Sequence, residues 1–255
     1  GVYDLAVVAL VFFLGRRLYG RWVGLLASFL MACTVLSIQH AHFFTVETFT
    51  TLLVTLAFYF TIRAVQDGRW TDWALTGATF GMAVAGKISV GTYVLIICMA
   101  ALLRAQREPA PLVVAADGAP ALWRRRLGGL SISLQMSGDA EATTRRAAFL
   151  RGLTRAAAGL VLAGLVSIVA FRVTQPYAFT GPSPFNFAIS QRWLQQDVLA
   201  AQSLVNGTVD FPPSHQWTDR EPILFAWRNM VLWGMGLPLG LAAWLGWLVA
   251  VLELV

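Results

Sequence analysis

The chain has 255 residues, of which 57% are hydrophobic and only 13% are charged, and its mean hydropathy is +0.65. This balance excludes an ordinary soluble domain and is typical of a polytopic membrane protein. The net charge of +6 does not indicate a nucleic-acid partner, because the basic residues gather in clusters between apolar runs and form no recognition motif.

Apolar runs recur along the whole chain and are apolar all round rather than striped, which predicts helices that face lipid or other helices. They lie at approximately 1–15, 22–38, 48–62, 73–86, 88–103, 156–171 and 229–252. The predicted fold is therefore all-α, a polytopic integral membrane protein with about seven transmembrane helices. Gly1 already lies inside a run, so we expect a piece of a longer protein. Cys33 and Cys98 both lie in apolar runs, and no disulfide framework is expected.

Three basic clusters alternate with these runs and predict the orientation, because positive residues collect in cytoplasmic loops. They are Arg16/Arg17/Arg21, Arg63/Arg69 and the nine arginines from Arg104 to Arg155. The predicted organisation has five parts: N-terminal transmembrane helices (about five) with outer-face segments over 1–103, an Arg-rich cytoplasmic loop over 104–155, a transmembrane helix over 156–171, an outer-face loop over 172–228 and a last transmembrane helix over 229–255. Its site is expected on the outer face, and the predicted location is the bacterial inner membrane.

The long outer-face loop over 172–228 is expected to contain structure of its own. Apolar side chains recur at helical spacing in the stretch FNFAISQRWLQQDVLAAQSLV, which predicts an amphipathic helix at the interface. These side chains are Phe187, Leu194, Val198, Ala201 and Val205. The following stretch, DFPPSHQWTDREP, is broken by prolines and is expected to be irregular.

Rare ionisable residues concentrate on the predicted outer face. The stretch QHAHFFTVETF at 39–49 carries His40, His42 and Glu47, and Lys87 lies in the turn between two short apolar runs. Ionisable groups at a membrane boundary are costly unless they are paired or hydrated, so they are candidates for function. Asp4 is similar, near the outer end of the first run. The remaining polar and cationic candidates in the outer segments are Arg172, Arg192, His215 and Arg220.

These residues suit a site for a phosphorylated lipid and a sugar. Cations bind phosphate and stabilise a phosphate leaving group. A carboxylate can accept the proton of an acceptor, and aromatic faces suit the apolar side of a sugar ring.

Each candidate also has an ordinary structural explanation. Glu47 could be a helix N-terminal acid favoured by the macrodipole, and Lys87 could extend toward water from an apolar helix end. His40 and His42 could be interfacial polar residues, and a His-x-His pair with a distant acid supplies too few ligands to indicate a metal site. The sequon NGT at 206–208 is short enough to arise by chance.

Three stretches, GRRLYGRWVGLLASFL, SIQHAHFFTVETFTTLLVTLAFYF and GATFGMAVAGKISVGTYVL, resemble the polyprenol-phosphate-sugar-dependent glycosyltransferases with the C-type membrane fold. This class includes the protein O-mannosyltransferases and the aminoarabinose transferases of lipid A. The later stretches TQPYAF, DFPPSHQW and WGMGLPLG resemble a bacterial branch of these enzymes. The resemblance covers roughly the first hundred residues and the outer segment from 174 onward.

The resemblance implies roles for single residues. It makes Glu47, where aspartate is usual, a supporting acid near the acceptor or a divalent cation. It makes Lys87, preceded by Gly86 where threonine is usual, the partner of the donor phosphate. The principal catalytic acid of the class lies in an outer loop expected upstream of Gly1. The further substrate-binding candidates are His40, His42, Gln175, Tyr177, His215, Gln216, Trp217 and Arg220.

The predicted function is therefore a membrane glycosyltransferase that moves a sugar from a polyprenyl-phosphate donor to an acceptor at the outer face of the cell envelope. A non-enzymatic membrane transporter or assembly subunit for lipid-linked saccharides is the alternative, and an inactive relative is a third reading. Partners expected for the enzyme are the lipid-linked sugar donor and membrane lipid, with no nucleic acid.

Overall fold

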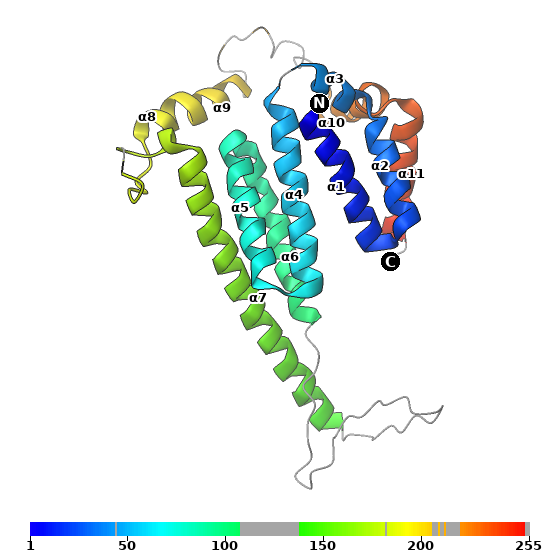
Figure 1. Cartoon of the computed structure of the whole chain (residues 1–255), viewed down its shortest axis with the longest axis vertical. Coiled ribbons are helices and arrows are strands. Elements are labelled where there is room, and N and C mark those ends of the chain that lie inside the picture. Colours follow the sequence, from blue (N-terminus) through cyan, green and yellow to red (C-terminus); the bar gives the residue numbers. More distant parts are fainter. Residues whose placement is uncertain are drawn as a thin grey trace. The chain divides into compact units, whose positions relative to one another are not determined.

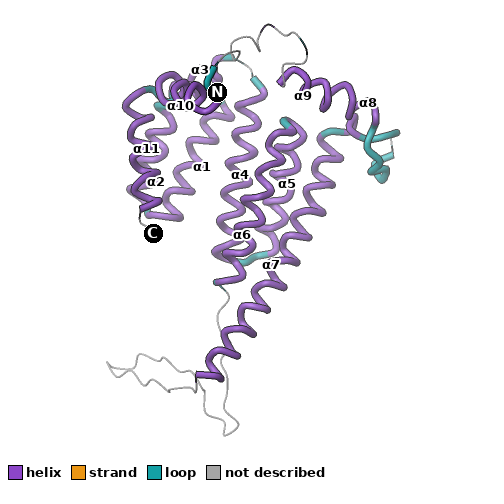
Figure 2. Tube along the Cα trace, turned by 180° about the vertical axis from the view of Figure 1, so that it is seen from behind, coloured by secondary structure: helices purple, strands orange, loops and turns teal. Residues whose placement is uncertain are grey.

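The computed structural model describes residues 1–43, 45–107, 138–181, 183–205, 209, 212 and 220–252 (Figure 1). Within these residues the structure is helices and the loops between them, as Figure 2 shows. The β pairing found there is a single isolated antiparallel bridge between Phe179 and Ile189. The predicted all-α class is confirmed.

The helices follow the apolar runs of the sequence, with short 3₁₀ and π segments at several of their ends. They are α1 (Val2–Tyr19), α2 (Arg21–Ala32), α3 (Val35–His42), α4 (Val46–Asp67), α5 (Trp70–Gly86), the 3₁₀ helix η1 (Ile88–Tyr93), α6 (Val94–Gln106), α7 (Gly138–Thr174), the 3₁₀ helix η2 (Pro176–Ala178), α8 (Gln191–Trp193), the π-helix η3 (Leu194–Leu199), α9 (Ala200–Val205), α10 (Pro222–Asn229), the π-helix η5 (Met230–Gly234) and α11 (Leu237–Leu252).

The chain divides into two compact units. The first unit comprises residues 1–59, 78–91 and 167–255, and the second comprises residues 60–77 and 92–166. Helices α4, α5 and α7 each contribute one part to the first unit and the other part to the second.

In the first unit, α1 and α2 form a tight antiparallel hairpin, and they lie side by side in both ribbon views (Figures 1 and 2). Gly20 connects them with a φ of 102°, a conformation that glycine adopts at no steric cost. A Cβ on Gly15 would lie 2.8 Å from the Cα of Gly24, and a Cβ on Gly24 would lie 2.7 Å from the carbonyl oxygen of Phe12. The two glycines therefore let the helix backbones approach closely, as small residues do in membrane helix pairs.

In the second unit, the turn from α4 to α5 is held by a buried ion pair. The Arg63 Nε lies 2.9 Å from Oδ1 of Asp72, whose side chain is fully buried. Breaking such a pair by removing one partner is strongly destabilising, because it leaves a buried charge uncompensated. Next to it, the Trp73 ring packs on Gly159 of α7, where a Cβ would lie 2.6 Å from the indole.

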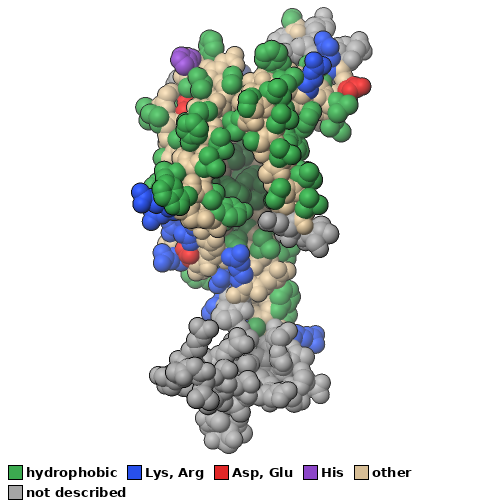
Figure 3. Space-filling view, turned by 90° about the vertical axis from the view of Figure 1, so that its right-hand side faces the viewer, with side chains coloured by type: hydrophobic (Ala, Val, Ile, Leu, Met, Phe, Trp, Pro, Cys, Tyr) green, Lys and Arg blue, Asp and Glu red, His purple; other side chains and the backbone are tan. Residues whose placement is uncertain are grey.

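Among the residues that the structure describes, three helical segments are long and apolar enough to cross a membrane by length and composition, namely Val46–Asp67, Ile88–Gln106 and Arg146–Thr174. The pair α2 and α3 would add a fourth span if it is counted as one segment bent by 56°. The coarse prediction of several membrane helices is confirmed, whereas the number of about seven stays a prediction. Figure 3 shows a face covered largely by hydrophobic side chains, as expected for a surface in contact with lipid.

Several predicted helix boundaries differ from the structure. The boundary at 155/156 falls inside α7, which begins at Gly138 because the charged stretch before the apolar run is rich in alanine and arginine, both strong helix formers. The run at 22–38 is divided between α2 and α3, because Thr34 has an extended conformation between them. The run at 229–252 is interrupted at Gly236, which has a φ of 83°.

The segment after α7 is folded around Arg172. This side chain is only 6% exposed, and it donates hydrogen bonds from Nε to the carbonyl of Asn186 (3.0 Å) and from Nη2 to that of Ser183 (2.6 Å). Its guanidinium also lies 4.9 Å from the ring centroid of Phe179. Arg172 is thus largely buried, and its Nε and Nη2 groups donate to carbonyls of this loop.

The predicted amphipathic helix begins later than its pattern suggested. It runs from Gln191 to Val205 through α8, η3 and α9, so Phe187 lies outside it. The hydroxyl of Ser190 accepts a hydrogen bond from the backbone N–H of Trp193 and caps the helix there.

Candidate functional site

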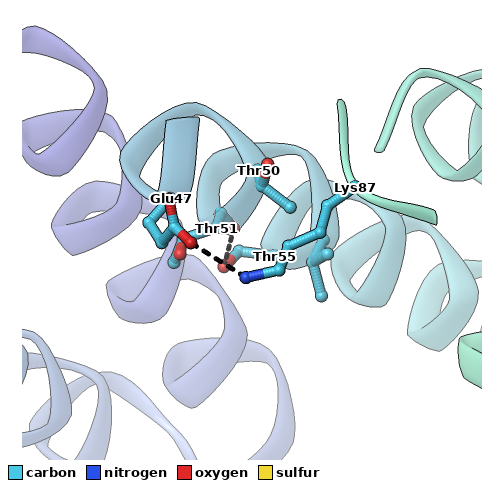
Figure 4. Close-up of a pocket in the computed structure, with 6 residues that line it drawn as sticks. Glu47, Thr50, Thr51, Thr55 and Lys87 are labelled. Atoms are coloured by element: carbon cyan, nitrogen blue, oxygen red, sulfur yellow. Dashed lines mark hydrogen bonds and ion pairs between the residues drawn. The ribbon is translucent and has the colours of Figure 1, made fainter. Parts of the chain in front are cut away.

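The candidate site lies in the first unit, where the start of α4 meets the end of α5. Glu47 stands in the first turn of α4, and Lys87 directly follows the last residue of α5. Lys87 Nζ donates a hydrogen bond to Oε1 of Glu47 at 2.8 Å (Figure 4). The two residues singled out separately in the sequence are therefore partners in space.

Both members of this pair remain accessible. The side chain of Glu47 is 40% exposed and that of Lys87 is 48% exposed. An exposed ion pair stabilises a fold by only about 0.2–1 kcal/mol, so stability is a weak reason for its presence. Both charged groups therefore lie at the protein surface, where each can exchange its partner for a ligand.

The pair borders a pocket of about 220 Å³, which we call the lysine hollow. It is lined by Glu47, Thr50, Thr51, Val54, Thr55 and Lys87 (Figure 4). Since residues four apart share one helix face, the spacing of Glu47, Thr51 and Thr55 explains why their side chains lie along one side of the hollow. The hydroxyl of Thr55 donates to the carbonyl of Thr51 at 2.7 Å.

The threonines of the lysine hollow were missed as site residues in the sequence. The signal was present, because hydroxyl residues recur at Thr48, Thr50, Thr51 and Thr55 in a helix that is otherwise apolar. Such residues are also common in membrane helices for packing reasons, so the spacing becomes informative only once Lys87 is known to lie opposite.

The two histidines of the stretch 39–49 have different surroundings. His40 Nδ1 lies 3.3 Å from the hydroxyl of Thr45, and the His40 side chain lines a second hollow beside Glu47. His42 Nδ1 lies 2.7 Å from the carbonyl oxygen of Ile38 within its own helix, and it lines neither hollow. The structure therefore brings His40, but not His42, next to the Glu47–Lys87 pair.

The remaining predicted site residues lie elsewhere. Gln175 directly precedes η2 and Tyr177 lies within it, where Tyr177 is 83% exposed. Neither residue lines either hollow. Arg220 lies over the ring of Phe225, with 5.2 Å between the guanidinium carbon and the centroid. His215, Gln216 and Trp217 lie outside the described residues, as does the sequon at 206–208.

The described part of the chain contains no group of three or more His, Cys, Asp and Glu side chains arranged to hold a metal ion. The chemistry that these residues can supply is thus that of one ammonium, one carboxylate and several hydroxyls around a small open hollow. An ammonium and hydroxyls bind phosphate oxygens well, and a carboxylate accepts protons or hydrogen bonds.

The comparison with protein families returns one match. Residues 2–116 match the family model described as dolichyl-phosphate-mannose-protein mannosyltransferase. The matched segment is just under half of the chain, and it contains Asp4, His40, Glu47 and Lys87. The comparisons with curated proteins and with solved structures each find no match.

This match supports a membrane glycosyltransferase that uses a lipid-linked sugar donor. Together with the apolar helices, it also supports an integral membrane protein. It agrees with the resemblance seen in the sequence at the level of the family, and it covers both members of the Glu47–Lys87 pair.

Proposed function

We propose that the protein is an integral-membrane glycosyltransferase that moves a sugar from a polyprenyl-phosphate donor to an acceptor at the outer face of the membrane. The observation that carries this proposal is the 2.8 Å contact between Lys87 and Glu47 at the lysine hollow. Lys87 is the single lysine in the chain, and it lies where an anionic head group can reach it from solvent.

Sugar transfer breaks the bond between the anomeric carbon of the sugar and a phosphate oxygen, and that oxygen gains negative charge as the bond breaks. An ammonium placed at this oxygen stabilises the charge more in the transition state than in the ground state, which accelerates the step. Lys87 is the residue that we assign to this role. Thr51 and Thr55 line the same hollow beside the phosphate position.

The new bond forms between the anomeric carbon and an acceptor atom, whose proton must pass to a base. Glu47 is assigned as a supporting acid that orients the acceptor and competes with phosphate for Lys87. The resemblance to this class of enzymes implies that a further carboxylate takes that proton. The basic clusters of the sequence support an outer-face position for this site.

The proposal is tested with the full-length protein in proteoliposomes, supplied with labelled polyprenyl-phosphate sugars and a cell-envelope fraction as acceptor. We expect sugar transfer by the wild type and a loss of about 100-fold or more in K87M, since removing one charge-stabilising donor costs about 10²–10³ in rate. R228M, which removes an exposed cation outside the hollows, should keep wild-type turnover. Normal turnover in K87M at normal membrane insertion would contradict the proposal.

A further inference from the structure

A second hollow adjoins the lysine hollow and has a different chemical character. We call it the aspartate hollow. It has a volume of about 160 Å³, and Glu47 and Thr51 line both hollows. Its other polar lining residues are Asp4, Ser37, His40 and Thr48. Glu47 therefore forms a wall shared by two neighbouring spaces.

Asp4 is brought to this wall by the packing of α1 on α4. The ring of Tyr3 meets that of Phe49 edge to face, with centroids 5.5 Å apart. Asp4 directly follows Tyr3 in α1, so this contact lies next to Asp4. The Asp4 side chain is 22% exposed, and its Oδ2 lies 3.5 Å from the amino nitrogen of Gly1. Within the part of the chain that the structure describes, this buried oxygen accepts no hydrogen bond.

The two hollows differ in charge. The aspartate hollow is lined by two carboxylates, one imidazole and three hydroxyls, and neither lysine nor arginine is among its lining residues. Such a lining offers acceptors to the hydroxyl or amino groups of a neutral or cationic ligand. The described side chains there do not form a metal-binding group, so a hydrogen-bonding ligand fits better than a bare cation.

The volume of the aspartate hollow also indicates the size of group that it can hold. A volume of about 160 Å³ corresponds to roughly five water molecules at ~30 Å³ each. A cavity of about 150 Å³ binds benzene, so a single six-membered ring is a group of suitable size for this hollow. Three apolar side chains complete the lining, which suits the less polar face of a sugar.

We propose that the aspartate hollow binds the sugar ring of the donor, with Asp4 accepting hydrogen bonds from its hydroxyl or amino groups while the donor phosphate lies at Lys87. This inference rests on the proposed function and deepens it, since it assigns the two parts of one donor to two adjoining hollows. The bond that breaks during transfer would then lie beside Glu47, on the wall that the hollows share.

The experiment compares the affinity of the full-length protein for polyprenyl phosphate without a sugar and for polyprenyl phosphates that carry mannose, glucose or an amino sugar. The variants are D4N, which keeps the shape of Asp4, and K87M. The matched control is D197N, which neutralises an exposed aspartate outside both hollows. We expect D4N to weaken binding of the preferred sugar-bearing lipid by about ten- to 100-fold, the effect of losing a charge-assisted hydrogen bond. Its affinity for the sugar-free lipid should stay unchanged, whereas K87M should weaken both.

The other outcomes overturn the inference in distinguishable ways. If D4N binds the sugar-bearing lipid as the wild type does, or weakens both lipids equally, Asp4 does not read the sugar, while the proposed function stands as long as K87M loses both. If the wild type binds the sugar-bearing lipids no more tightly than the sugar-free lipid, the hollow contributes nothing to the donor. If the wild type binds neither lipid, the proposed function fails together with the inference.

Discussion

At the scale of single residues, the Glu47–Lys87 pair is a resting arrangement of two exposed charges. The contact satisfies both of them in the absence of a ligand, but it contributes only about 0.2–1 kcal/mol. A phosphate has more oxygens than a carboxylate, so it can accept from Lys87 and from the threonine hydroxyls of the lysine hollow at the same time. Glu47 occupies Lys87 in the ligand-free protein, so a binding substrate must displace the Glu47 carboxylate from Lys87.

This competition predicts the behaviour of E47Q. Glutamine removes the competing charge without changing the shape. The affinity for sugar-free polyprenyl phosphate should therefore rise by about 1.4-fold to fivefold, which is the binding ratio that corresponds to about 0.2–1 kcal/mol for an exposed ion pair. Binding of the labelled lipid to purified full-length protein measures it. E221Q, which changes an exposed glutamate before α10, should behave as the wild type. Weaker binding by E47Q would show that Glu47 assists the phosphate and does not compete with it.

Sequence reasoning could identify Glu47 and Lys87 singly, because a charge at the boundary of an apolar run is rare and costly. Their pairing across 40 residues could not be derived in this way, since it depends on how the ends of α4 and α5 meet. Arg172 is the opposite case. Its guanidinium is of the kind that binds phosphate, but its Nε and Nη2 groups donate to loop carbonyls, and no local sequence pattern reveals these bonds.

At the scale of helices, close contacts of small residues position the elements. Within the second unit, Gly77 of α5 lies against Ala163 of α7, so closely that a Cβ on Gly77 would overlap the Ala163 carbonyl oxygen. Within the first unit, Gly81 meets Ser167 in the same way. These contacts form the small-xxx-small pattern of membrane helix pairs.

Replacing Gly77 with alanine should therefore destabilise the protein, by about 1–3 kcal/mol, because the new methyl group meets backbone atoms that cannot move aside. Thermal unfolding in detergent measures this as a lower midpoint. The matched control is G164A on α7, where nothing lies within 4 Å of the added Cβ, and it should be neutral or slightly stabilising through helix propensity. Equal midpoints for the two variants would contradict the packing described.

The loop around Arg172 gives a second prediction at this scale. R172M removes two hydrogen bonds and the contact with Phe179, so the segment from 176 to 190 should become more susceptible to limited proteolysis. R192M is the control, because Arg192 is exposed and donates to Gln196 within its own helical segment. Cleavage patterns that are equal in R172M and the wild type would show that the loop is held by other contacts.

The helices themselves were largely predictable, because apolar runs of sufficient length leave few other structures in lipid. Their ends and breaks were not. The early start of α7 at Gly138 depends on alanine and arginine propensity in a charged stretch, and the division between α2 and α3 depends on the conformation of Thr34. Hydropathy alone does not register either feature.

At the level of the whole molecule, an outer-face site requires one particular orientation of the chain in the membrane. The arginine clusters predict that the α1–α2 turn faces the cytoplasm and that the loop after α7 faces outward. Single cysteines at Tyr19 and Phe185, which are 76% and 87% exposed, test this in a background with Cys33 and Cys98 replaced by alanine. A membrane-impermeant maleimide should label F185C in intact cells and Y19C only after permeabilisation. The reverse pattern would place the candidate site on the cytoplasmic side.

An experimental structure of the full-length protein bound to polyprenyl phosphate tests most directly whether Lys87 holds the phosphate of a lipid-linked sugar donor. A phosphate oxygen should lie about 2.7–2.9 Å from Lys87 Nζ, the distance of a charge-assisted hydrogen bond, in place of the Glu47 carboxylate. A phosphate bound away from the lysine hollow, with the Glu47–Lys87 contact intact, would contradict the account.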